Sequence, residues 1–312
     1  MTEERTSEDF EVISYGYSHV GLKRSHNEDQ FQILEKQKLY IVADGMGGHS
    51  CGEVASQLAV DSVVKFFEQT KDDTEVTWPF RSDKNLKYHE NRLLCGIRLA
   101  NQRIFDQAQS HVKYRGMGTT IVTILIQKNE VYVGHVGDSR VYIFRNSQLE
   151  QLTEDHSLLN DFKKARKMTE EEIANFPHKN IIVRALGMRE TVQVDISRLI
   201  AEPGDILLLC SDGLSGMISD ERIAEIIEKY KGNLKLCCHE LINEANEAGG
   251  HDNITAILAH VHEQGKAPEV DESLNTKDNE EVLDLEDEEL IEINEEESLT
   301  DPGHRSRIKE EN

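Results

Sequence analysis

The sequence predicts an α+β fold in which antiparallel β-sheets are covered on the outside by helices. Residues 9–262 alternate between short runs rich in Val, Ile, Leu and Tyr and longer segments with helical periodicity. Many of the short runs follow one another through tight turns, and few are separated by a helix as in a βαβ unit. Tight strand pairs favour antiparallel hairpins, so the helices are expected to pack against the sheets.

The individual elements follow from these patterns in chain order. We expect strands at 11–18, 30–35, 38–43, 120–126, 131–136, 140–145, 192–199, 206–210 and 254–261. We expect helices at 52–69, 90–110, 169–174, 220–230 and 233–247. The first helix places its apolar residues near one face, and Glu53 suits the positive end of the helix dipole. These residues are Val54, Leu58, Val63, Phe66 and Phe67.

A change in composition near His262 predicts where the domain ends. Residues 263–312 contain 19 acidic and 5 basic residues and no aromatic residue, so they carry −14 of the formal charge of −24. Such a segment buries too little apolar surface to offset chain entropy, and we expect a disordered tail. Apolar residues from Val282 to Ile293 leave open a short helix that docks on a partner, although a solvated tail is favoured. We therefore expect one domain over 1–262.

Charge and composition argue against several classes of protein. Asp and Glu number 59 against 35 Lys and Arg, so the basic footprint of a nucleic-acid or membrane-surface protein is missing. The apolar runs are strand-sized, and residues 1–15 do not resemble a signal peptide. Five cysteines without a pair at zinc spacing predict buried thiols outside disulfides. We expect a cytoplasmic monomer.

Four aspartates stand at the ends of apolar, strand-like runs. Asp44, Asp138 and Asp212 each follow such a run within a glycine-containing turn, and Asp252 opens the last run. Any one of them alone reads as a turn-capping aspartate. A buried carboxylate is costly unless it is paired or bound to a metal, and four in matching contexts indicate one pocket of oxygen ligands. Hard divalent cations such as Mg²⁺ and Mn²⁺ prefer such ligands.

Two predicted hairpins carry acidic residues to one end of a sheet. In the first hairpin, opposed residues have numbers that sum to about 73, so Glu28 lies beside Gly45 and next to Asp44. In the second, the sum is about 257, so Asp138 faces Thr119. A register slip of one residue would spoil both alignments.

Short motifs that follow one another over residues 12–262 carry a family resemblance. They are Arg24–Asp29, Asp44–His49 followed by Gly52–Ser56, Met117–Thr120, Gly137–Arg140, Thr153–Ser157, Arg184–Gly187, Ser211–Leu214 and Asp252–Thr255. With these motifs in this order, the chain resembles the bacterial metal-dependent protein phosphatases of the PP2C (PPM) class. The resemblance implies a four-layer αββα sandwich of two antiparallel sheets flanked by helices.

The resemblance also implies a binuclear Mn²⁺ or Mg²⁺ centre in a cleft at one end of the sandwich. Asp44 would bridge the two ions, the backbone carbonyl of Gly45 would bind one, and Asp212 and Asp252 would hold the other. Glu28 would reach the ion on the Gly45 side directly or through water. Behind these ligands the resemblance implies a supporting place for Asp29, and it implies a weaker third ion at Asp138 and Asp212.

The activity implied is hydrolysis of phosphoserine and phosphothreonine in proteins, opposing Ser/Thr kinases. Its partners would be phosphorylated proteins and a cognate kinase, without nucleic acid or membrane. Two cations about 3.5–4 Å apart can activate a shared water that attacks phosphorus directly. Arg24 can bind two phosphate oxygens through its planar guanidinium. No cysteine lies in a phosphate-binding loop before an arginine, so a thiolate nucleophile is unsupported, and Ser139 and Ser211 are expected to shape turns.

One position departs from the animal and plant members. Met46 stands where those members carry a histidine that is proposed as the general acid. Another group must then protonate the leaving alkoxide, and a metal-held water near Asp138 is our candidate. His49, His156 and His251 are the alternatives, although structural hydrogen bonding is favoured for each.

Residues 158–183 are rich in Lys, Glu and Asn and predict a mobile flap beside the cleft that contacts the substrate protein. An inert surface insertion is the alternative. Two other functions also compete with a phosphatase. A catalytically inactive phosphoprotein-binding module would be expected to lose metal-site acids, and the four aspartates are present. A two-metal phosphodiesterase or nuclease would need a basic or aromatic strand-binding surface.

Overall fold

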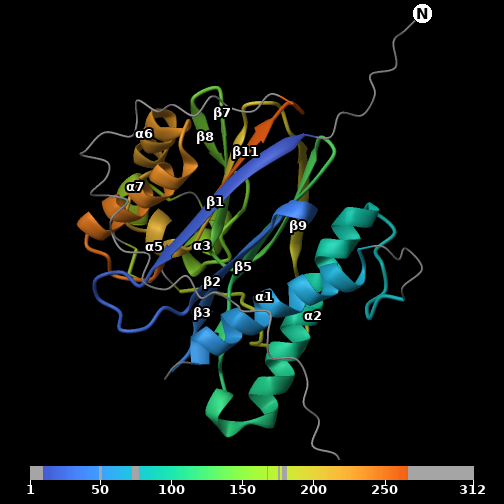
Figure 1. Ribbon diagram of the computed structural model, residues 1–312. Coiled ribbons are helices and arrows are strands. Elements are labelled where there is room, and N and C mark those ends of the chain that lie inside the picture. Colours follow the sequence, from blue (N-terminus) through green and yellow to red (C-terminus); the bar gives the residue numbers. More distant parts are fainter. Residues whose placement is uncertain are drawn as a thin grey trace, which may run out of the picture.

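Two antiparallel sheets form the centre of the protein, as the computed structural model shows for residues 10–48, 51–71, 77–166, 168–174, 176–177 and 181–265 (Figure 1). The first sheet has the strand order β1-β11-β10-β7-β8, and the second has the order β2-β3-β5-β6-β9 with β4 paired to β3. The strands are β1 (Glu11–His19), β2 (Asp29–Leu34), β3 (Leu39–Met46), β4 (Gly118–Thr119), β5 (Ile121–Gln127), β6 (Glu130–Val136), β7 (Arg140–Arg145), β8 (Gln148–Gln151), β9 (Asp195–Ile200), β10 (Ile206–Cys210) and β11 (Ile254–His262).

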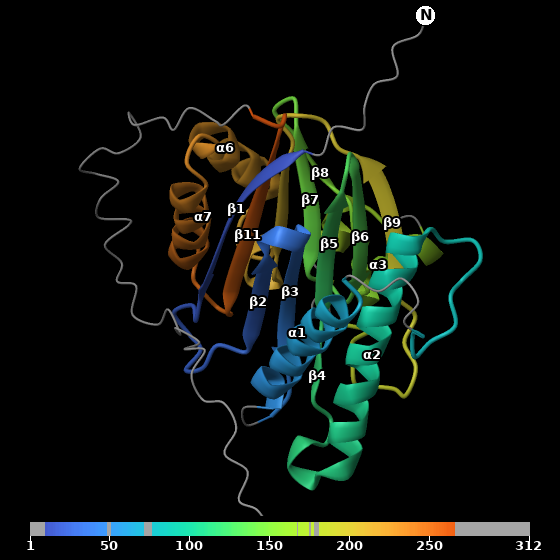
Figure 2. The same ribbon diagram turned by 45° about the vertical axis from the view of Figure 1, so that its right-hand side comes forward.

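Helices cover the outer faces of both sheets (Figure 2). α1 and α2 lie on the second sheet, and α5, α6 and α7 lie on the first. The helices are α1 (Cys51–Gln69), α2 (Tyr88–Ser110), α3 (Leu158–Ala165), α4 (Glu170–Ala174), α5 (Asp212–Ser215), α6 (Asp220–Tyr230) and α7 (Leu234–Glu247), with 3₁₀ turns at Glu35–Gln37 and Val112–Tyr114. The predicted α+β class and the implied αββα layering are both confirmed.

Three apolar layers hold this sandwich together. Strand β10 shows why, because its side chains alternate between two buried faces. Leu207 and Leu209 pack between the sheets, whereas Leu208 and Cys210 pack against the helices on the other face. Burial on both faces explains why this strand reads as a continuous apolar run in the sequence. The remaining layer lies between the second sheet and the helices α1 and α2.

The predicted elements are all present, and four further elements lay outside the prediction. Strand β4 has two residues and helix α5 is a single turn, so neither has a period to detect. Strand β8 is a polar edge strand whose pairing with β7 decides its conformation. Helix α3 begins at Leu158, the first residue of the segment read as a flap, and the Ser157 side chain caps it by accepting from the Asn160 amide. On α1, the buried face runs through Ala55, Ala59 and Val63, while Val54 and Leu58 lie only partly buried at its edge.

The hairpin registers agree with the sequence prediction in the ladders themselves. Asp29 pairs with Asp44 in the first hairpin, which gives the predicted sum of 73, and Ile121 pairs with Val136 in the second, which gives 257. The predicted pairing of Thr119 with Asp138, beyond the end of the second ladder, was wrong. Thr119 pairs with Gly45 instead, because residues 118–119 form the separate strand β4 on β3 before β5 begins.

The five cysteines are buried and none forms a disulfide, as predicted. Among the described residues, no helix is both long and apolar enough to traverse a lipid bilayer. The acidic tail from residue 266 onwards lies outside the described residues, so its predicted disorder and its docking alternative stay predictions.

Candidate metal centre

The four aspartates predicted to share a pocket meet at one end of the sandwich. Asp44 lies near the end of β3, Asp212 begins α5 directly after β10, and Asp252 precedes β11. In Figure 2, the end of β3 and the beginning of β11 lie at the lower ends of their sheets. Asp138 follows β6, and its charge acts on Asp44 together with those of Asp212 and Asp252. Carboxylates separated by more than 200 residues in the chain are therefore neighbours in the fold.

Burial, followed by the mutual repulsion of these carboxylates, shapes the electrostatics of the site. Burial, and then the charges of Asp29, Asp212, Asp138 and Asp252, raise the pKa of Asp44 well above its ordinary value. Burial and the charge of Asp212 raise the pKa of Asp138 to about 7. Burial and Asp252 also raise the pKa of Asp212, although a hydrogen bond with Asp44 partly offsets this. A group of acids that disfavour one another's charge is matched to a cation.

Asp29 joins this group from the facing strand. Its Oδ2 accepts hydrogen bonds from Ser211 Oγ at 2.7 Å and from Thr255 Oγ1 at 2.6 Å. Burial raises the pKa of Asp29 to about 7, with Asp212 and Asp252 adding to the rise. Asp29 is thus anchored by two hydroxyl groups behind the other acids, where the resemblance implied a supporting residue.

Unsatisfied oxygen atoms provide a test of whether a metal fits here. Oδ1 of Asp29, Oδ1 of Asp138 and Oδ1 of Asp212 are buried and accept no hydrogen bond from the described residues. Buried polar atoms in native proteins are nearly always partnered, so such a cluster needs an explanation. Divalent cations supply it, because carboxylate oxygens are the ligands that Mn²⁺ and Mg²⁺ prefer. The donor set therefore fits the predicted metal.

Glycines allow the first turn of α1 to approach Glu28 and β3 closely. A Cβ at Gly45 would lie 2.2 Å from the carbonyl oxygen of Gly52, and a Cβ at Gly52 would lie 2.7 Å from Cδ of Glu28. The Gly45 amide donates to the Glu28 carbonyl at 3.1 Å, and the Gly52 amide interacts with the Glu28 carboxylate. Burial raises the pKa of Glu28, and the charge of Arg24 opposes that rise. Glu28 and Gly45 are side by side, as the hairpin register predicted.

Arg24 lies on the exposed rim of the carboxylate group. Its Nη2 donates to Asp252 Oδ2 at 2.8 Å, and the two side chains are 48% and 36% exposed. Asn253 holds the preceding loop in place, because its Nδ2 donates to the carbonyls of Val20 and His26 and its Oδ1 accepts from the Glu28 amide. Arg24 is thus both accessible to solvent and next to the acids, as a phosphate-binding residue must be.

The hydroxyl groups of two threonines hold Asp44 in place, a role that the sequence analysis did not predict. Thr120 Oγ1 accepts from the Asp44 amide at 3.0 Å and lies 2.6 Å from Ser139 Oγ, next to Asp138. Thr119 Oγ1 donates to the Asp44 carbonyl at 2.8 Å. The two threonines occupy the Met117–Thr120 motif, so their place in that motif was the available signal. Ser139 and Ser211 hold neighbouring groups in place, in agreement with the turn-shaping role predicted for them.

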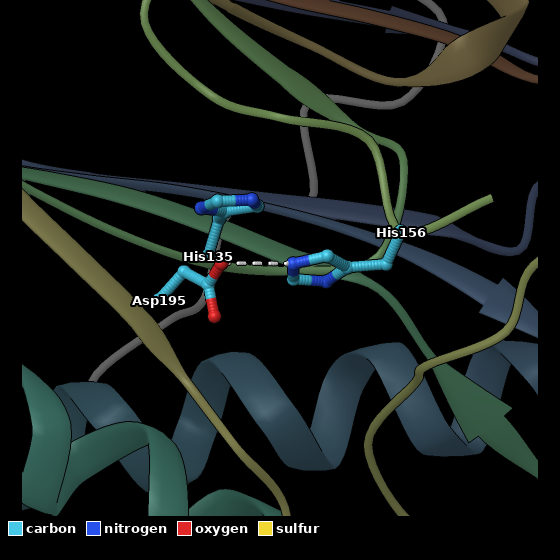
Figure 3. A group of neighbouring side chains, drawn as sticks. All are labelled: His135, His156 and Asp195. Atoms are coloured by element: carbon cyan, nitrogen blue, oxygen red, sulfur yellow. Dashed lines mark hydrogen bonds and ion pairs between the residues drawn. The ribbon is translucent and has the colours of Figure 1, made fainter. Parts of the chain in front are cut away.

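A second polar cluster lies beside the carboxylates and contains His135, His156 and Asp195 (Figure 3). One ligand-type atom from each residue lies within 4.8 Å of the others, so the group has the composition and spacing of a metal site. However, Arg184 Nη1 already lies 2.7 Å from Asp195 Oδ1 and 2.8 Å from His156 Nε2. This guanidinium supplies the positive charge that a metal would bring, and the cluster is a hydrogen-bonded network.

The histidines named as possible general acids have different surroundings. Both ring nitrogens of His156 are engaged within the network, so it fulfils the structural role that was favoured for it. His251 is exposed, and His49 lies outside the described residues. In the segment read as a flap, the described residues form α3 and α4, and its predicted mobility and substrate contacts stay predictions.

Comparison with known proteins agrees with this fold and identifies a family. A family model for protein phosphatase 2C matches residues 15–258. The serine/threonine phosphatase stp of Listeria welshimeri is 38% identical over 241 residues, which span 76% of this chain and 91% of that protein. The crystal structure of the Mycobacterium tuberculosis serine/threonine phosphatase PstP/Ppp matches with a TM-score of 0.70 at 34% identity, over 80% of this chain and 99% of that one.

A further solved structure contains metal. It is described as the catalytic domain of PstP in complex with two manganese ions, and it matches with a TM-score of 0.68 at 33% identity, over 81% of this chain and 99% of that one. The fold, the family model and these relatives agree. The chain therefore belongs to the protein phosphatase 2C family, and it is an enzyme of the serine/threonine phosphatase class.

Proposed function

We propose that this protein is a metal-dependent phosphatase that hydrolyses phosphoserine and phosphothreonine in proteins and thereby opposes Ser/Thr kinases. One observation carries the proposal, namely the convergence of buried carboxylates whose oxygens lack partners and whose charges repel one another. The manganese ions of the related PstP catalytic domain support the same chemistry. Mn²⁺ and Mg²⁺ both suit this donor set.

Each residue has a distinct role in this proposal. Asp44 and the Gly45 carbonyl, with Asp212 and Asp252, hold the two core ions, and Glu28 completes the set. Asp138 and Asp212 hold a weaker third ion. When bound, the metal ions supply an activated water and neutralise charge on the phosphoryl oxygens.

Arg24 binds and orients the phosphate of the substrate. Its guanidinium is half exposed and can turn from Asp252 to an incoming phosphate, which offers two oxygens in the plane of the guanidinium fork. The hydroxyl groups of Thr119, Ser211 and Thr255 hold the surrounding acids still, so that little reorganisation is needed during the reaction. The substrates would be phosphorylated cytoplasmic proteins, and the protein would act as a monomer.

Hydrolysis assays test this proposal directly. The full-length protein is expected to hydrolyse p-nitrophenyl phosphate after addition of Mn²⁺ and not in EDTA, and then to release phosphate from a phosphothreonine peptide. Activity of equal rate in EDTA would overturn the metal dependence. Hydrolysis of the small ester without any action on phosphoserine or phosphothreonine peptides would overturn the proposed substrate class.

A further inference from the structure

His156 connects the turn that carries Asp138 to the segment 181–183. Its amide donates to the Gly137 carbonyl at 2.9 Å, and its ring Nδ1 accepts from the Gly137 amide at 3.0 Å. On the other side, the His156 carbonyl accepts from the Val183 amide at 2.9 Å, and the adjacent Ser157 pairs with Ile182. His156 therefore binds both the amide and the carbonyl of Gly137, and it also binds Val183, which directly precedes Arg184.

Gly137 depends on these contacts because its conformation is unusual. Its φ of +113° lies in a region that favours glycine, and a Cβ there would come within 2.6 Å of Thr120 Cβ. The peptide between Gly137 and Asp138 sets the direction of the Asp138 side chain. The buried Gly137 amide points at the His156 ring, so loss of that acceptor leaves a buried donor unsatisfied.

Asp195 and Arg184 contact the other side of the His156 ring. Nε2 lies 3.2 Å from Asp195 Oδ2 (Figure 3) and 2.8 Å from Arg184 Nη1, which also donates to Asp195 Oδ1 at 2.7 Å. Since a guanidinium nitrogen only donates, its contact with Nε2 does not select the tautomer in which Nδ1 accepts. The two residues therefore fix the orientation of the ring, and the acceptor role of Nδ1 follows from the Gly137 amide.

We propose that His156 is a positioning residue for the Asp138 metal ligand, acting through the Gly137 peptide, with its ring oriented by Asp195 and Arg184. The same residue couples Asp138 to the segment 181–183, so displacement of that segment would change the affinity for the weaker metal ion. This inference rests on the proposed function, because it takes Asp138 as a ligand.

Two substitutions of His156 separate the two halves of the ring. In His156→Asn, the side-chain oxygen occupies the position of Nδ1 and can still accept from the Gly137 amide, but the contact with Asp195 is lost. In His156→Gln, the terminal amide reaches towards Asp195, and the Gly137 amide loses its acceptor. We expect the weakest Mn²⁺ affinity of the full-length protein, measured by titration calorimetry, to stay within about threefold for Asn and to fall about tenfold or more for Gln.

Two further variants make the outcome decisive. His239 is a buried histidine that stacks on Tyr17 and bonds to Tyr15, far from Asp138 in the fold, so His239→Gln reports a loss of stability alone. It should lower the melting temperature and leave every Mn²⁺ affinity unchanged. Asp138→Ala, measured in parallel, should weaken the same Mn²⁺ ion that His156→Gln weakens.

The possible results distinguish this inference from the proposed function. If Asp138→Ala weakens one Mn²⁺ ion while Asn and Gln at position 156 have equal affinities, or Gln binds more tightly, the positioning role is wrong and the metal role of Asp138 stands. If Asp138→Ala changes no Mn²⁺ affinity, the third-ion part of the proposed function is wrong and the inference falls with it.

Discussion

Two polar regions, one on each side of Asp138, differ in how their charges are balanced. In the carboxylate group around Asp44, the acids raise one another's pKa and three of their oxygens have no hydrogen-bond partner among the described residues. In the network around His156, burial alone would raise the pKa of Asp195, but hydrogen bonds and charge from His156 and Arg184 lower it. In the second region, side chains of the protein compensate the negative charge, whereas the first region is suited to compensation by bound cations.

This difference shows that ligand-type side chains at metal-like spacing do not by themselves define a metal site. His135, His156 and Asp195 meet the distance criterion, yet Arg184 provides the compensating charge. Among the described residues, the arginines whose charges reach the acids around Asp44 are paired at their edge, because Arg24 binds Asp252 and Arg140 binds Asp155. Charge compensation, and not spacing, separates the two.

The largest effect is expected from removal of the central acid. In Asp44→Asn, the rate of phosphate ester hydrolysis in saturating Mn²⁺ should fall about a thousandfold or more, which corresponds to about 4 kcal/mol. Steady-state assays with p-nitrophenyl phosphate measure it. An activity within tenfold of wild type would contradict the central role of Asp44.

Addition of metal should stabilise the first region specifically. A ligand that binds only the folded state at about 100 times its Kd contributes about 2.7 kcal/mol. We therefore expect Mn²⁺ to raise the melting temperature of the wild-type protein, and to raise it much less in Asp44→Asn. An equal rise in both would place the bound metal elsewhere.

Substitution of an acid that binds a cationic side chain and of one that lies among other acids should change stability in different directions. Asp205 is buried and its carboxylate accepts from the Arg145 guanidinium and the Glu202 amide. Asp205→Asn should cost about 1–3 kcal/mol, whereas Asp44→Asn should leave the metal-free protein as stable or more so, because a repulsive charge is removed. Chemical denaturation in EDTA measures both changes. A similar loss of stability in the two variants would contradict the inference that Asp44 is repelled by its neighbours whereas Asp205 is stabilised by Arg145.

The two regions should also respond to pH with opposite signs. The folded-state pKa of Asp138 is raised from 3.8 to about 7, so the stability that it contributes to the metal-free protein is lost as pH rises from about 4 to about 7. Burial lowers the pKa of His156 from 6.5 to about 4, so its contribution is lost as pH falls from about 6.5 to about 4.

Comparison of wild type with a variant at each position isolates the pH dependence that comes from Asp138 or from His156. The free energy of unfolding of wild type relative to Asp138→Asn should fall with rising pH in EDTA, and that of wild type relative to His156→Asn should fall with decreasing pH. Each slope is at most on the order of 1 kcal/mol per pH unit for one group. Slopes of the same sign would contradict the assigned charges.

A smaller effect is expected at the rim. Arg24→Lys keeps the charge and loses the planar fork, so KM for a phosphothreonine peptide should rise about tenfold with kcat changed less. Lys113→Arg, on the exposed 3₁₀ turn, is a suitable control and should leave both constants unchanged. An unchanged KM in Arg24→Lys would argue against bidentate phosphate binding.

Much of the fold was available from local patterns. The hairpin through Asp29 and Asp44 was predicted to the exact pair, because alternation and a short turn fix a register together. The helices α6 and α7 were also predicted, and each has a polar cap and an apolar buried face within its own residues. Strand β8 and the β4 pairing escaped prediction because neighbouring strands, and not their own residues, select their conformation.

The sequence by itself determined which residues we propose as metal ligands, because buried aspartates at strand ends are costly unless they are paired or bound to a metal. Only the tertiary structure decided which charges remain uncompensated. Asp195 stands in an ordinary strand and Arg184 in a loop, and nothing in either local pattern shows that they meet at His156. Electrostatic balance depends on distances across the fold, and those distances are set by packing between segments far apart in the chain.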